Sequence, residues 1–178
     1  GNPDDIKAIV KGVRDRFGRI DTVVNSAAIV RIIPVGKITP ADIDEFHRIN
    51  VAGSMNMALA CLPALRKTKG SIINFSSSIA TKPSRDMVCY ATTKGAVEAF
   101  TKILALELAP KVRVNCISPG LVKSEAYLQA GVDPAGIRAI EKFAASIYPM
   151  GRVGEPRDVS ELARYLISDK AEWLTGLI

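Results

Sequence analysis

The sequence predicts an α/β fold built on a parallel sheet, and two observations carry this prediction. Short apolar runs of strand length alternate along the chain with longer segments in which apolar residues recur at helical spacing. The short runs are almost continuously apolar, which is typical of strands that helices bury on both faces. No internal repeat, low-complexity tract or linker divides the chain, so we expect residues 1–178 to form a single domain.

A helix is expected first, over residues 2–18, "NPDDIKAIVKGVRDRFG". Asn2 suits the N-cap, Pro3 the first turn, and Asp4 and Asp5 the positive end of the helix dipole. The chain begins with glycine rather than methionine, and its last residues, "WLTGLI", stop where a further strand begins. We therefore expect the chain to be a piece of a longer protein.

Three apolar runs predict the strands of the sheet. They are "DTVVN" at 21–25, "GSIINFSS" at 70–77 and "VRVNCIS" at 112–118. A helix-length segment separates each run from the next, which is the spacing that parallel strands need.

Two long helices connect these strands, over residues 39–67 and 88–109. Thr39 is the expected cap of the first helix and Pro40 its first residue, whereas Pro63 is expected to bend or end that helix. The chain becomes irregular after residue 120, with glycine and proline recurring up to residue 136. Beyond that stretch we expect helices near 137–147 and from Pro156 to about Ser168.

Composition narrows the class of protein. A hydrophobic share of 48% with 24% charged residues is ordinary for a globular protein, and no apolar run is long enough to span a membrane. The three cysteines, Cys61, Cys89 and Cys116, have no metal-ligand spacing and cannot all pair. We interpret them as reduced, buried thiols of an intracellular protein, and we expect no metal site.

The net charge of +6 raises the question of nucleic-acid binding. Lys and Arg are scattered among acidic residues instead of gathering in one run, which favours a solvated surface. Nucleic-acid binding remains a rival hypothesis that rests only on the net charge. It predicts an affinity that falls steeply with salt concentration.

Small and polar residues follow all three predicted strands, at the points where the strands end. They are "NSAA" at 25–28, the serines 76–78, and Pro119 with Gly120. Ligands of an open parallel sheet bind at the carboxyl ends of its strands, so these residues are expected to share one rim. Turn chemistry alone explains any one of these strand ends, whereas three together favour a site.

Tyr90 and Lys94 stand four residues apart at the start of the helix 88–109. This spacing places both side chains on one face of the helix, with their Cβ atoms about 5–6 Å apart. A nearby ammonium group can lower the pKa of a phenol by up to about 3 units, toward the range where proton transfer is effective at neutral pH. An incidental surface pair is the alternative.

Further motifs occur in a fixed order around "YATTK". Ser77 lies thirteen residues before Tyr90, Asn50 lies within the preceding long helix, and "NSAA" and "RVNCISPG" follow two strands. In this combination the chain resembles the classical short-chain dehydrogenase/reductase family over nearly all of its length. The resemblance implies a doubly wound, Rossmann-type parallel sheet.

The resemblance also implies roles for four catalytic residues. Tyr90 would be the general acid in carbonyl reduction and the general base in alcohol oxidation. Lys94 would lower the pKa of Tyr90 and hold the nicotinamide ribose, and Ser77 would hydrogen-bond the substrate oxygen. Asn50 would hold a water molecule that links Lys94 to solvent. Ser77 and Tyr90 would thus be the substrate-binding residues.

The implied cofactor is NAD or NADP. Besides Tyr90 and Lys94, the resemblance assigns cofactor contacts to residues at two strand ends. Asn25 and Ala27 would lie along the adenosine half of the cofactor. The nicotinamide half would be flanked by Pro119, Gly120, Val122 and Ser124.

Two departures from the family pattern stand out. Ser26 and Ala28 replace an asparagine and a glycine of the usual "NNAG". The glycine-rich turn that cradles the pyrophosphate does not occur in these 178 residues, so we expect the N-terminal part of the fold to lie before residue 1.

Several tempting residues are interpreted as structural. His47, the only histidine, and Cys89, next to Tyr90, have no catalytic partner in the sequence. Arg31 and Arg85 flank the candidate site loops, but a solvated arginine is the simpler interpretation of each. Strand alternation turns Ser76 and Ser78 to the face opposite Ser77.

The expected function is an NAD(P)-dependent oxidoreductase acting on a secondary alcohol or ketone; the alternative is a non-catalytic scaffold or interaction protein that has lost cofactor binding. Residues 121–147 would form the substrate loop, with Tyr127, Phe143 and Tyr148 in a partly apolar pocket. A cytoplasmic homo-oligomer, a tetramer or dimer, is implied, with Phe46, Met55, Met57 and two long helices at its interface.

Overall fold

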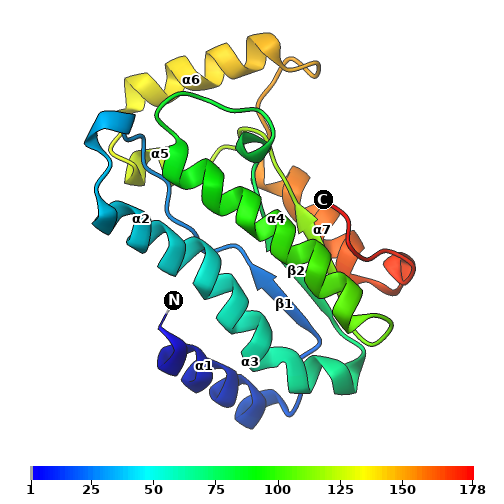
Figure 1. Ribbon diagram of the computed structural model, residues 1–178. Helices are drawn as coiled ribbons and strands as arrows, with labels where there is room; N and C mark the ends of the chain where they lie inside the picture. Colours follow the sequence, from blue (N-terminus) through cyan, green and yellow to red (C-terminus); the bar gives the residue numbers. More distant parts are fainter. Residues whose placement is uncertain (1) are drawn as a thin grey trace.

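A computed structural model describes residues 2–178 and contains a parallel sheet of three strands (Figure 1). The strands are β1 (Thr22–Asn25), β2 (Ser71–Phe75) and β3 (Arg113–Ile117), in the order β1-β2-β3. In the register, Val24 stands beside Ile73, which stands beside Asn115. The predicted α/β class and parallel sheet are confirmed.

Helices account for most of the remaining chain. The α-helices are α1 (Pro3–Phe17), α2 (Pro40–Phe46), α3 (Gly53–Thr68), α4 (Val88–Leu108), α5 (Ala126–Gln129), α6 (Pro134–Ile147) and α7 (Pro156–Ile167). A π-helix, η2 (His47–Ala52), joins α2 to α3. Short 3-10 turns are η1 (Val35–Lys37), η3 (Ser78–Ala80) and η4 (Asp169–Ala171).

Helices cover both faces of the sheet, as a doubly wound fold requires (Figure 1). On one face α3 and α4 pack over the strands, with α1 beside α3, and enclose a cluster that includes Leu65, Ile72 and Val114. On the other face α7 packs against β2 and β3, where Leu166 meets Ile73 and Ile117. Burial on both faces explains why the strand sequences are continuously apolar.

The helix expected over 39–67 exists as three consecutive segments, α2, η2 and α3. The Thr39 cap is confirmed, since its hydroxyl accepts a hydrogen bond from Asp42 N at 3.2 Å. Pro63 does not end the helix, because α3 continues to Thr68. Burial of Leu65 and its neighbours on the α3 face offsets the hydrogen bond that proline removes.

Helix capping explains where two other helices begin. Asn2 caps α1 as predicted, since its side chain accepts from Asp4 N at 2.9 Å. The expectation of a helix near 137–147 was wrong at its start, because α6 begins at Pro134. Asp133 accepts from Gly136 N at 2.6 Å, and proline suits the first helical turn.

The last residues run beside β3. Gly176 N donates to Val114 O at 2.7 Å, and Cys116 N donates to Leu177 O at 2.9 Å. The last residues therefore run alongside β3, but no strand is assigned to them, and the further strand stays an expectation. The opposite edge belongs to β1, where Val24 is 49% exposed.

The predicted burial of the three cysteines is confirmed, and all three are free thiols. Within residues 2–178, the structure has no helix whose length and apolar character would let it cross a membrane. Phe46 does not belong to an exposed helix face as expected, because it is completely buried. Met55 is partly exposed, whereas Met57 packs against the core.

Candidate active site

The carboxyl ends of β2 and β3 are tied together by backbone hydrogen bonds. Ser76 N donates to Ile117 O, and Ser78 N donates to Pro119 O, both at 2.9 Å. The loop carrying Ser77 therefore lies directly beside the loop that starts at Pro119. This is the shared rim that the strand ends predicted.

Ser77 and Tyr90 meet at this rim. Ser77 is the last extended residue before η3, and its hydroxyl accepts weakly from Ile79 N at 3.4 Å. Tyr90 lies in the first turn of α4, which packs against η3, and it is near enough to Ser77 for hydrogen bonding from that side chain to lower its pKa. Both side chains are half-buried.

Lys94 lies one turn further along α4 and is buried. Its ammonium donates to Phe75 O at 2.8 Å and stands 5.5 Å from the centroid of the Tyr90 ring. Burial lowers the pKa of Lys94 to about 8 because a desolvated ammonium group is disfavoured. One of its three N–H donors is used by Phe75, which leaves two for a ligand.

The expectation that Lys94 lowers the pKa of Tyr90 was wrong for this structure. The pKa of Tyr90 is raised above its ordinary value, mainly because burial disfavours the phenolate. The hydrogen bond with Ser77 lowers it, and the nearby Tyr127 raises it further. The Lys94 ammonium has little effect because it is directed at the Phe75 carbonyl and the face of the ring.

Asn50 lies inside the π-helix η2 and is almost completely buried. Its amide accepts from Ile29 N at 2.8 Å and donates to Ile29 O at 3.0 Å. It also donates to the Thr93 hydroxyl at 3.1 Å, next to Lys94. Asn50 thus fixes the loop after β1 against α4, a contact whose partner Thr93 the sequence analysis missed.

Ser76 is buried, whereas Ser77 is half-buried, and the side chain of Ser76 is directed at α4. Its hydroxyl donates to Lys94 O at 3.1 Å and to Glu98 at 2.8 Å. Glu98 also accepts from Ser118 at 3.4 Å. Glu98 therefore links two strand ends to α4; its position one turn after Lys94 was the available sequence signal.

Of the two residues expected near adenosine, Asn25 faces inward and Ala27 is exposed. The Asn25 amide donates to Asn74 at 2.8 Å and to Ser54 O at 3.2 Å. These bonds use both N–H donors of the Asn25 side chain, which is buried, so a contact with a ligand is expected from its backbone. Ala27 lies beyond the end of β1, on the rim.

The loop after β3 carries the other four expected cofactor residues and is held by Tyr148. The Tyr148 hydroxyl accepts from Leu121 N at 2.7 Å. A Cβ added to Gly120 would lie 2.8 Å from that hydroxyl, so the loop passes too close for a side chain. Val122 pairs with Gly154 in a parallel bridge, while Ser124 is exposed and Pro119 half-buried.

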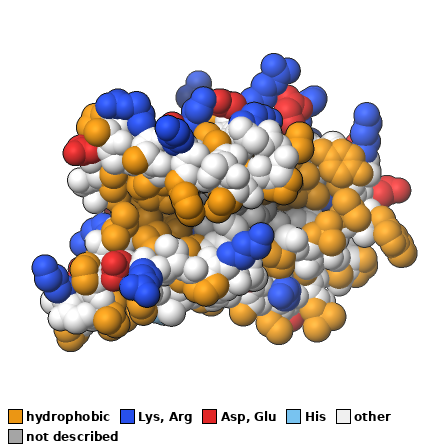
Figure 2. All heavy atoms as spheres, turned by 90° about the horizontal axis from the view of Figure 1, so that it is seen from above, with side chains coloured by type: hydrophobic (Ala, Val, Ile, Leu, Met, Phe, Trp, Pro, Cys, Tyr) orange, Lys and Arg blue, Asp and Glu red, His pale blue; other side chains and the backbone are white. Residues whose placement is uncertain are grey.

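A cavity of about 460 Å³ adjoins this rim. As expected, Tyr127 and Phe143 line it, but Tyr148 lines a different cavity beside the loop after β3. The remaining lining residues are Ile32, Ile79, Ser84, Arg85, Met87, Ala139 and Ile140. Figure 2 views the molecule from the side of α6 and shows hydrophobic side chains bordering a hollow.

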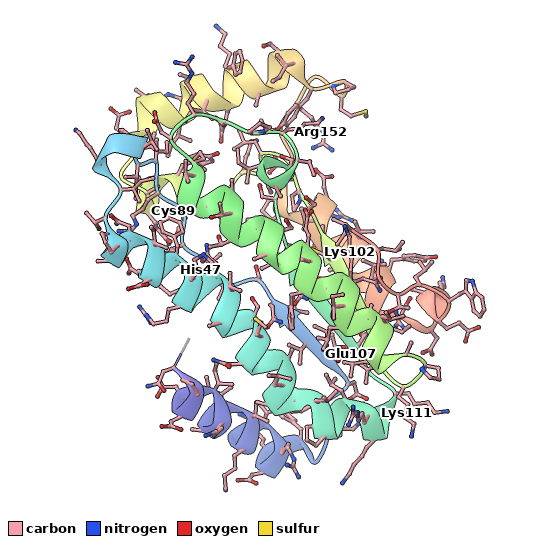
Figure 3. All side chains as sticks on the ribbon, viewed as in Figure 1. His47, Cys89, Lys102, Glu107, Lys111 and Arg152 are labelled. Atoms are coloured by element: carbon pink, nitrogen blue, oxygen red, sulfur yellow. The ribbon has the colours of Figure 1, made fainter. Side chains whose placement is uncertain are left out.

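Of the discounted residues, Arg85 lines the cavity, whereas His47, Cys89 and Arg31 do not. Figure 3 shows His47 at the start of η2, between α2 and α3, and Cys89 at the start of α4. His47 is exposed, whereas Cys89 is buried. Arg31 is not simply solvated, because it pairs with Glu45 at 2.5 Å and Asp42 at 3.4 Å. Residues 2–178 contain no cluster of His, Cys, Asp and Glu that could hold a metal ion.

Comparison with known proteins gives these residues their family context. The family model described as enoyl-(acyl carrier protein) reductase matches residues 1–178. A glucose/ribitol short-chain dehydrogenase/reductase from Brucella melitensis superposes with a TM-score of 0.91 at 30% identity, covering 99% of this chain and 69% of that one. The chain belongs to the short-chain dehydrogenase/reductase family.

Other family members give the same result. L-fucose dehydrogenase of Oryctolagus cuniculus is 36% identical over 176 residues, which are 98% of this chain and 62% of that protein. The 3-oxoacyl-[acyl-carrier-protein] reductase of Thermotoga maritima is 32% identical, over 98% of this chain and 70% of that protein. Ligand-free aldohexose dehydrogenase of Thermoplasma acidophilum superposes with a TM-score of 0.92 at 27% identity, covering 99% of this chain and 71% of that one. The chain thus spans about two thirds of the length of these relatives.

Members of the family use NAD or NADP, and the residues of this chain fit the nicotinamide half of such a cofactor. The ammonium of Lys94 has donors left over, and the loop from Pro119 to Ser124 is pinned in place by Tyr148. The pyrophosphate half requires a glycine-rich turn after a strand, and no such turn occurs in the 178 residues.

Proposed function

We propose that the protein is an oxidoreductase that transfers a hydride between NAD(P) and a secondary alcohol or ketone. The single observation that carries this proposal is the meeting of Ser77 and Tyr90 at the end of β2, with Lys94 one helical turn away. An enzyme that reduces a carbonyl needs a proton donor and an oxygen-binding group at one point. These residues supply both.

The cofactor would supply the hydride, and the protein would position the carbonyl and handle the proton. In the reduction direction Tyr90 donates its phenolic proton to the substrate oxygen. The raised pKa of Tyr90 suits this role, because the phenol stays protonated at neutral pH. Ser77 donates a hydrogen bond to the same oxygen and stabilises its developing negative charge.

In the oxidation direction Tyr90 has to accept a proton. Hydrogen bonding from Ser77 then favours the phenolate, since it lowers the pKa of Tyr90, and the free N–H groups of Lys94 are available to the ribose hydroxyls of the cofactor. A pKa of about 8 leaves most Lys94 side chains charged at neutral pH. Asn50, held next to Thr93, is proposed to keep a water molecule that connects Lys94 to solvent.

The cofactor is proposed to lie across the carboxyl ends of the strands. Asn25, through its backbone, and Ala27 contact the adenosine half. The nicotinamide half is contacted by Pro119, Gly120, Val122 and Ser124. The close approach of Gly120 to Tyr148 supports this placement, because it fixes the loop on which these four residues lie.

We also propose a homo-oligomer, a tetramer or dimer, in the cytoplasm. Large apolar side chains on α3 and α4 point outward: Leu59 is 55% exposed, Ile103 58% and Leu106 79%. Contact with a second subunit would remove this apolar surface from water, which is energetically favourable. The three free thiols suit a reducing compartment.

The test is a nicotinamide absorbance assay with the purified protein. NAD and NADP are each offered with secondary alcohols, and their reduced forms with the matching ketones, at about neutral pH. Substrate-dependent change in absorbance supports the proposal. Absence of both cofactor binding and any such change across the panel would leave the non-catalytic scaffold as the better account.

A further inference from the structure

The cavity beside the active site has apolar walls and one cation. Its apolar lining comes from the loop after β1, from η3 and from α6, through residues such as Ile32, Ile79 and Ile140. Arg85 is the one lysine or arginine that lines it, and no acidic residue does. A ligand that fills this cavity would therefore meet a mainly apolar surface and a single positive charge.

The two arginines near the site loops differ in whether their charge is already matched. Arg31 pairs with Asp42 and Glu45, and its guanidinium stacks 5.1 Å from the centroid of the Phe46 ring. Arg85, by contrast, has no ion pair or side-chain hydrogen bond with any of residues 2–178. Its five N–H donors are available to an anion.

The backbone around Arg85 is held against the cavity. Asp86 O accepts from Ile33 N at 2.8 Å, which joins the loop of Arg85 to the loop after β1. Asp86 has a positive φ of 62°, and the next residue, Met87, is buried and lines the cavity. These contacts hold the backbone next to Arg85, while the Arg85 side chain is exposed to solvent at the edge of the cavity.

The cavity lies next to the proton donor, although Ser77 and Tyr90 are not among its lining residues: Ile79, two residues after Ser77, and Met87, three residues before Tyr90, line it. Tyr127 lines the cavity and lies close enough to Tyr90 to raise its pKa. A molecule whose carbonyl sits between Ser77 and Tyr90 would therefore extend its body past Tyr127, along the apolar wall, toward Arg85.

We propose that Arg85 binds the carboxylate of the substrate, and that the substrate is an oxo acid or hydroxy acid with an apolar chain between its two functional groups. This inference rests on the proposed function for the reacting carbonyl. A guanidinium matches a carboxylate with two parallel hydrogen bonds, and one unpaired cation balances one negative charge. A monocarboxylate therefore fits better than a phosphate monoester, which carries about two charges.

The test compares levulinate, and its homologues with one and two more methylenes, with the methyl esters of the same acids. Each acid and its ester share the ketone and the chain, so the ratio of their kcat/KM values isolates the carboxylate. We expect the best acid to exceed its ester roughly 10- to 100-fold, the range of a charged hydrogen-bonded pair. In Arg85→Gln this ratio falls to about one, and in Arg85→Glu the ester is preferred.

Lys82→Gln is the matched control, because it removes a positive charge from the same loop at a residue that does not line the cavity. The acid-to-ester ratio should stay as in the wild type. An equal loss of the ratio in both glutamine variants would assign the preference to the general field of the surface and overturn the proposal. A wild-type ratio of about one or less would also overturn it.

Binding separates this inference from the proposed function. Hexanoate and hexanamide have no ketone and therefore cannot be substrates. Their binding is compared by ligand-observed NMR. Binding of hexanoate that exceeds that of hexanamide and depends on Arg85 supports the anion site even if no ketone is turned over. Turnover of the esters together with equal binding of the two probes would overturn the anion site and leave the proposed oxidoreductase standing.

Discussion

Two buried polar clusters lie a short distance apart in this molecule, and they use their hydrogen bonds in opposite ways. The amide cluster consists of Asn25, Asn74 and Thr101, and it lies between the sheet and α4. Asn25 donates to Asn74 at 2.8 Å, Asn74 donates to Thr101 at 2.9 Å, and Thr101 donates to Val97 O at 2.8 Å. This chain of bonds runs from β1 across β2 into α4.

The site cluster consists of Ser77, Tyr90 and Lys94, at the end of the sheet. Within it the Ser77 side chain lowers the pKa of Tyr90 by hydrogen bonding, and the Lys94 ammonium lies over the Tyr90 ring. The Lys94 ammonium donates one hydrogen bond to the Phe75 carbonyl. The hydroxyl groups of Ser77 and Tyr90 can each form a further hydrogen bond with a ligand.

The difference shows what separates a structural polar cluster from a candidate active site. A buried polar group that is fully bonded stabilises one arrangement of the core, and its removal leaves unpaired neighbours. A buried charge with spare donors destabilises the empty fold and becomes useful when a ligand arrives. The first cluster should therefore control stability, and the second should control turnover.

The largest effect is expected from Tyr90→Phe. Loss of the phenolic proton should reduce turnover about 100- to 10,000-fold, since positioned acid–base catalysis contributes this much. Thermal unfolding and cofactor titration should stay close to the wild type, because the ring still fills its place in α4. Retention of wild-type turnover would contradict the role proposed for the site cluster.

Asn74→Ala is the converse experiment on the amide cluster. The change leaves the Asn25 amide and the Thr101 hydroxyl without their partners, so we expect a loss of about 3 kcal/mol in the free energy of unfolding. Urea unfolding measures it, with Thr101→Val alone and in combination as the control for coupling between the two sites. A loss below about 0.5 kcal/mol would show that the cluster is not a structural one.

Lys94→Met should stabilise the protein at neutral pH. The pKa of Lys94 falls from 10.5 to about 8 on folding, so the unfolded chain binds this proton more tightly and the wild type loses stability as the pH falls from 10.5 to about 8. Methionine removes that penalty, by up to about 3 kcal/mol at pH 7, because each pKa unit is worth about 1.4 kcal/mol. Turnover should be lost at the same time.

Urea unfolding of both proteins from about pH 7 to 11 measures this effect of Lys94. The stability gap should narrow as the pH rises through the window above 8, because the wild-type ammonium becomes neutral there. A gap that is constant with pH would place the ammonium in a well-solvated position and contradict its burial.

The smallest effect concerns the loop beside the site. Tyr148→Phe removes the hydroxyl that accepts from Leu121 N and should lower the free energy of unfolding by about 1 kcal/mol. Tyr165→Phe is the matched control, since that hydroxyl is exposed and makes only a 3.4 Å bond to Lys170 O. Equal changes in the two variants would show that the loop does not depend on Tyr148.

The sequence motifs predicted which residues lie at the site, but they did not predict the electrostatics of the site. Ser77 and Tyr90 could be assigned to one rim because strand ends and helix starts are local features, and the structure brings them together. The pKa of Tyr90 could not be obtained in this way. The spacing of Tyr90 and Lys94 fixes a distance between Cβ atoms, whereas the pKa depends on burial and on where the ammonium points.

Some helix boundaries could likewise be predicted from local sequence, whereas others depend on tertiary packing. The starts of α1 and α2 follow from Asn2 and Thr39, since a cap acts within three residues. The persistence of α3 beyond Pro63 depends on core packing that lies far away in sequence. Thr93 and Glu98 were missed because their partners Asn50, Ser76 and Ser118 come from other elements.

The sequence by itself determined the parallel α/β architecture, the family and the set of residues at the strand ends, because periodicity, capping and motif spacing are written in neighbouring residues. Only the tertiary structure decided which charges are matched and which are left free. Arg31 and Arg85 look alike in the sequence, yet folding neutralises the first and leaves the second on a cavity wall. The physical reason is that desolvation and ion pairing depend on every group that packing brings near, at any distance along the chain.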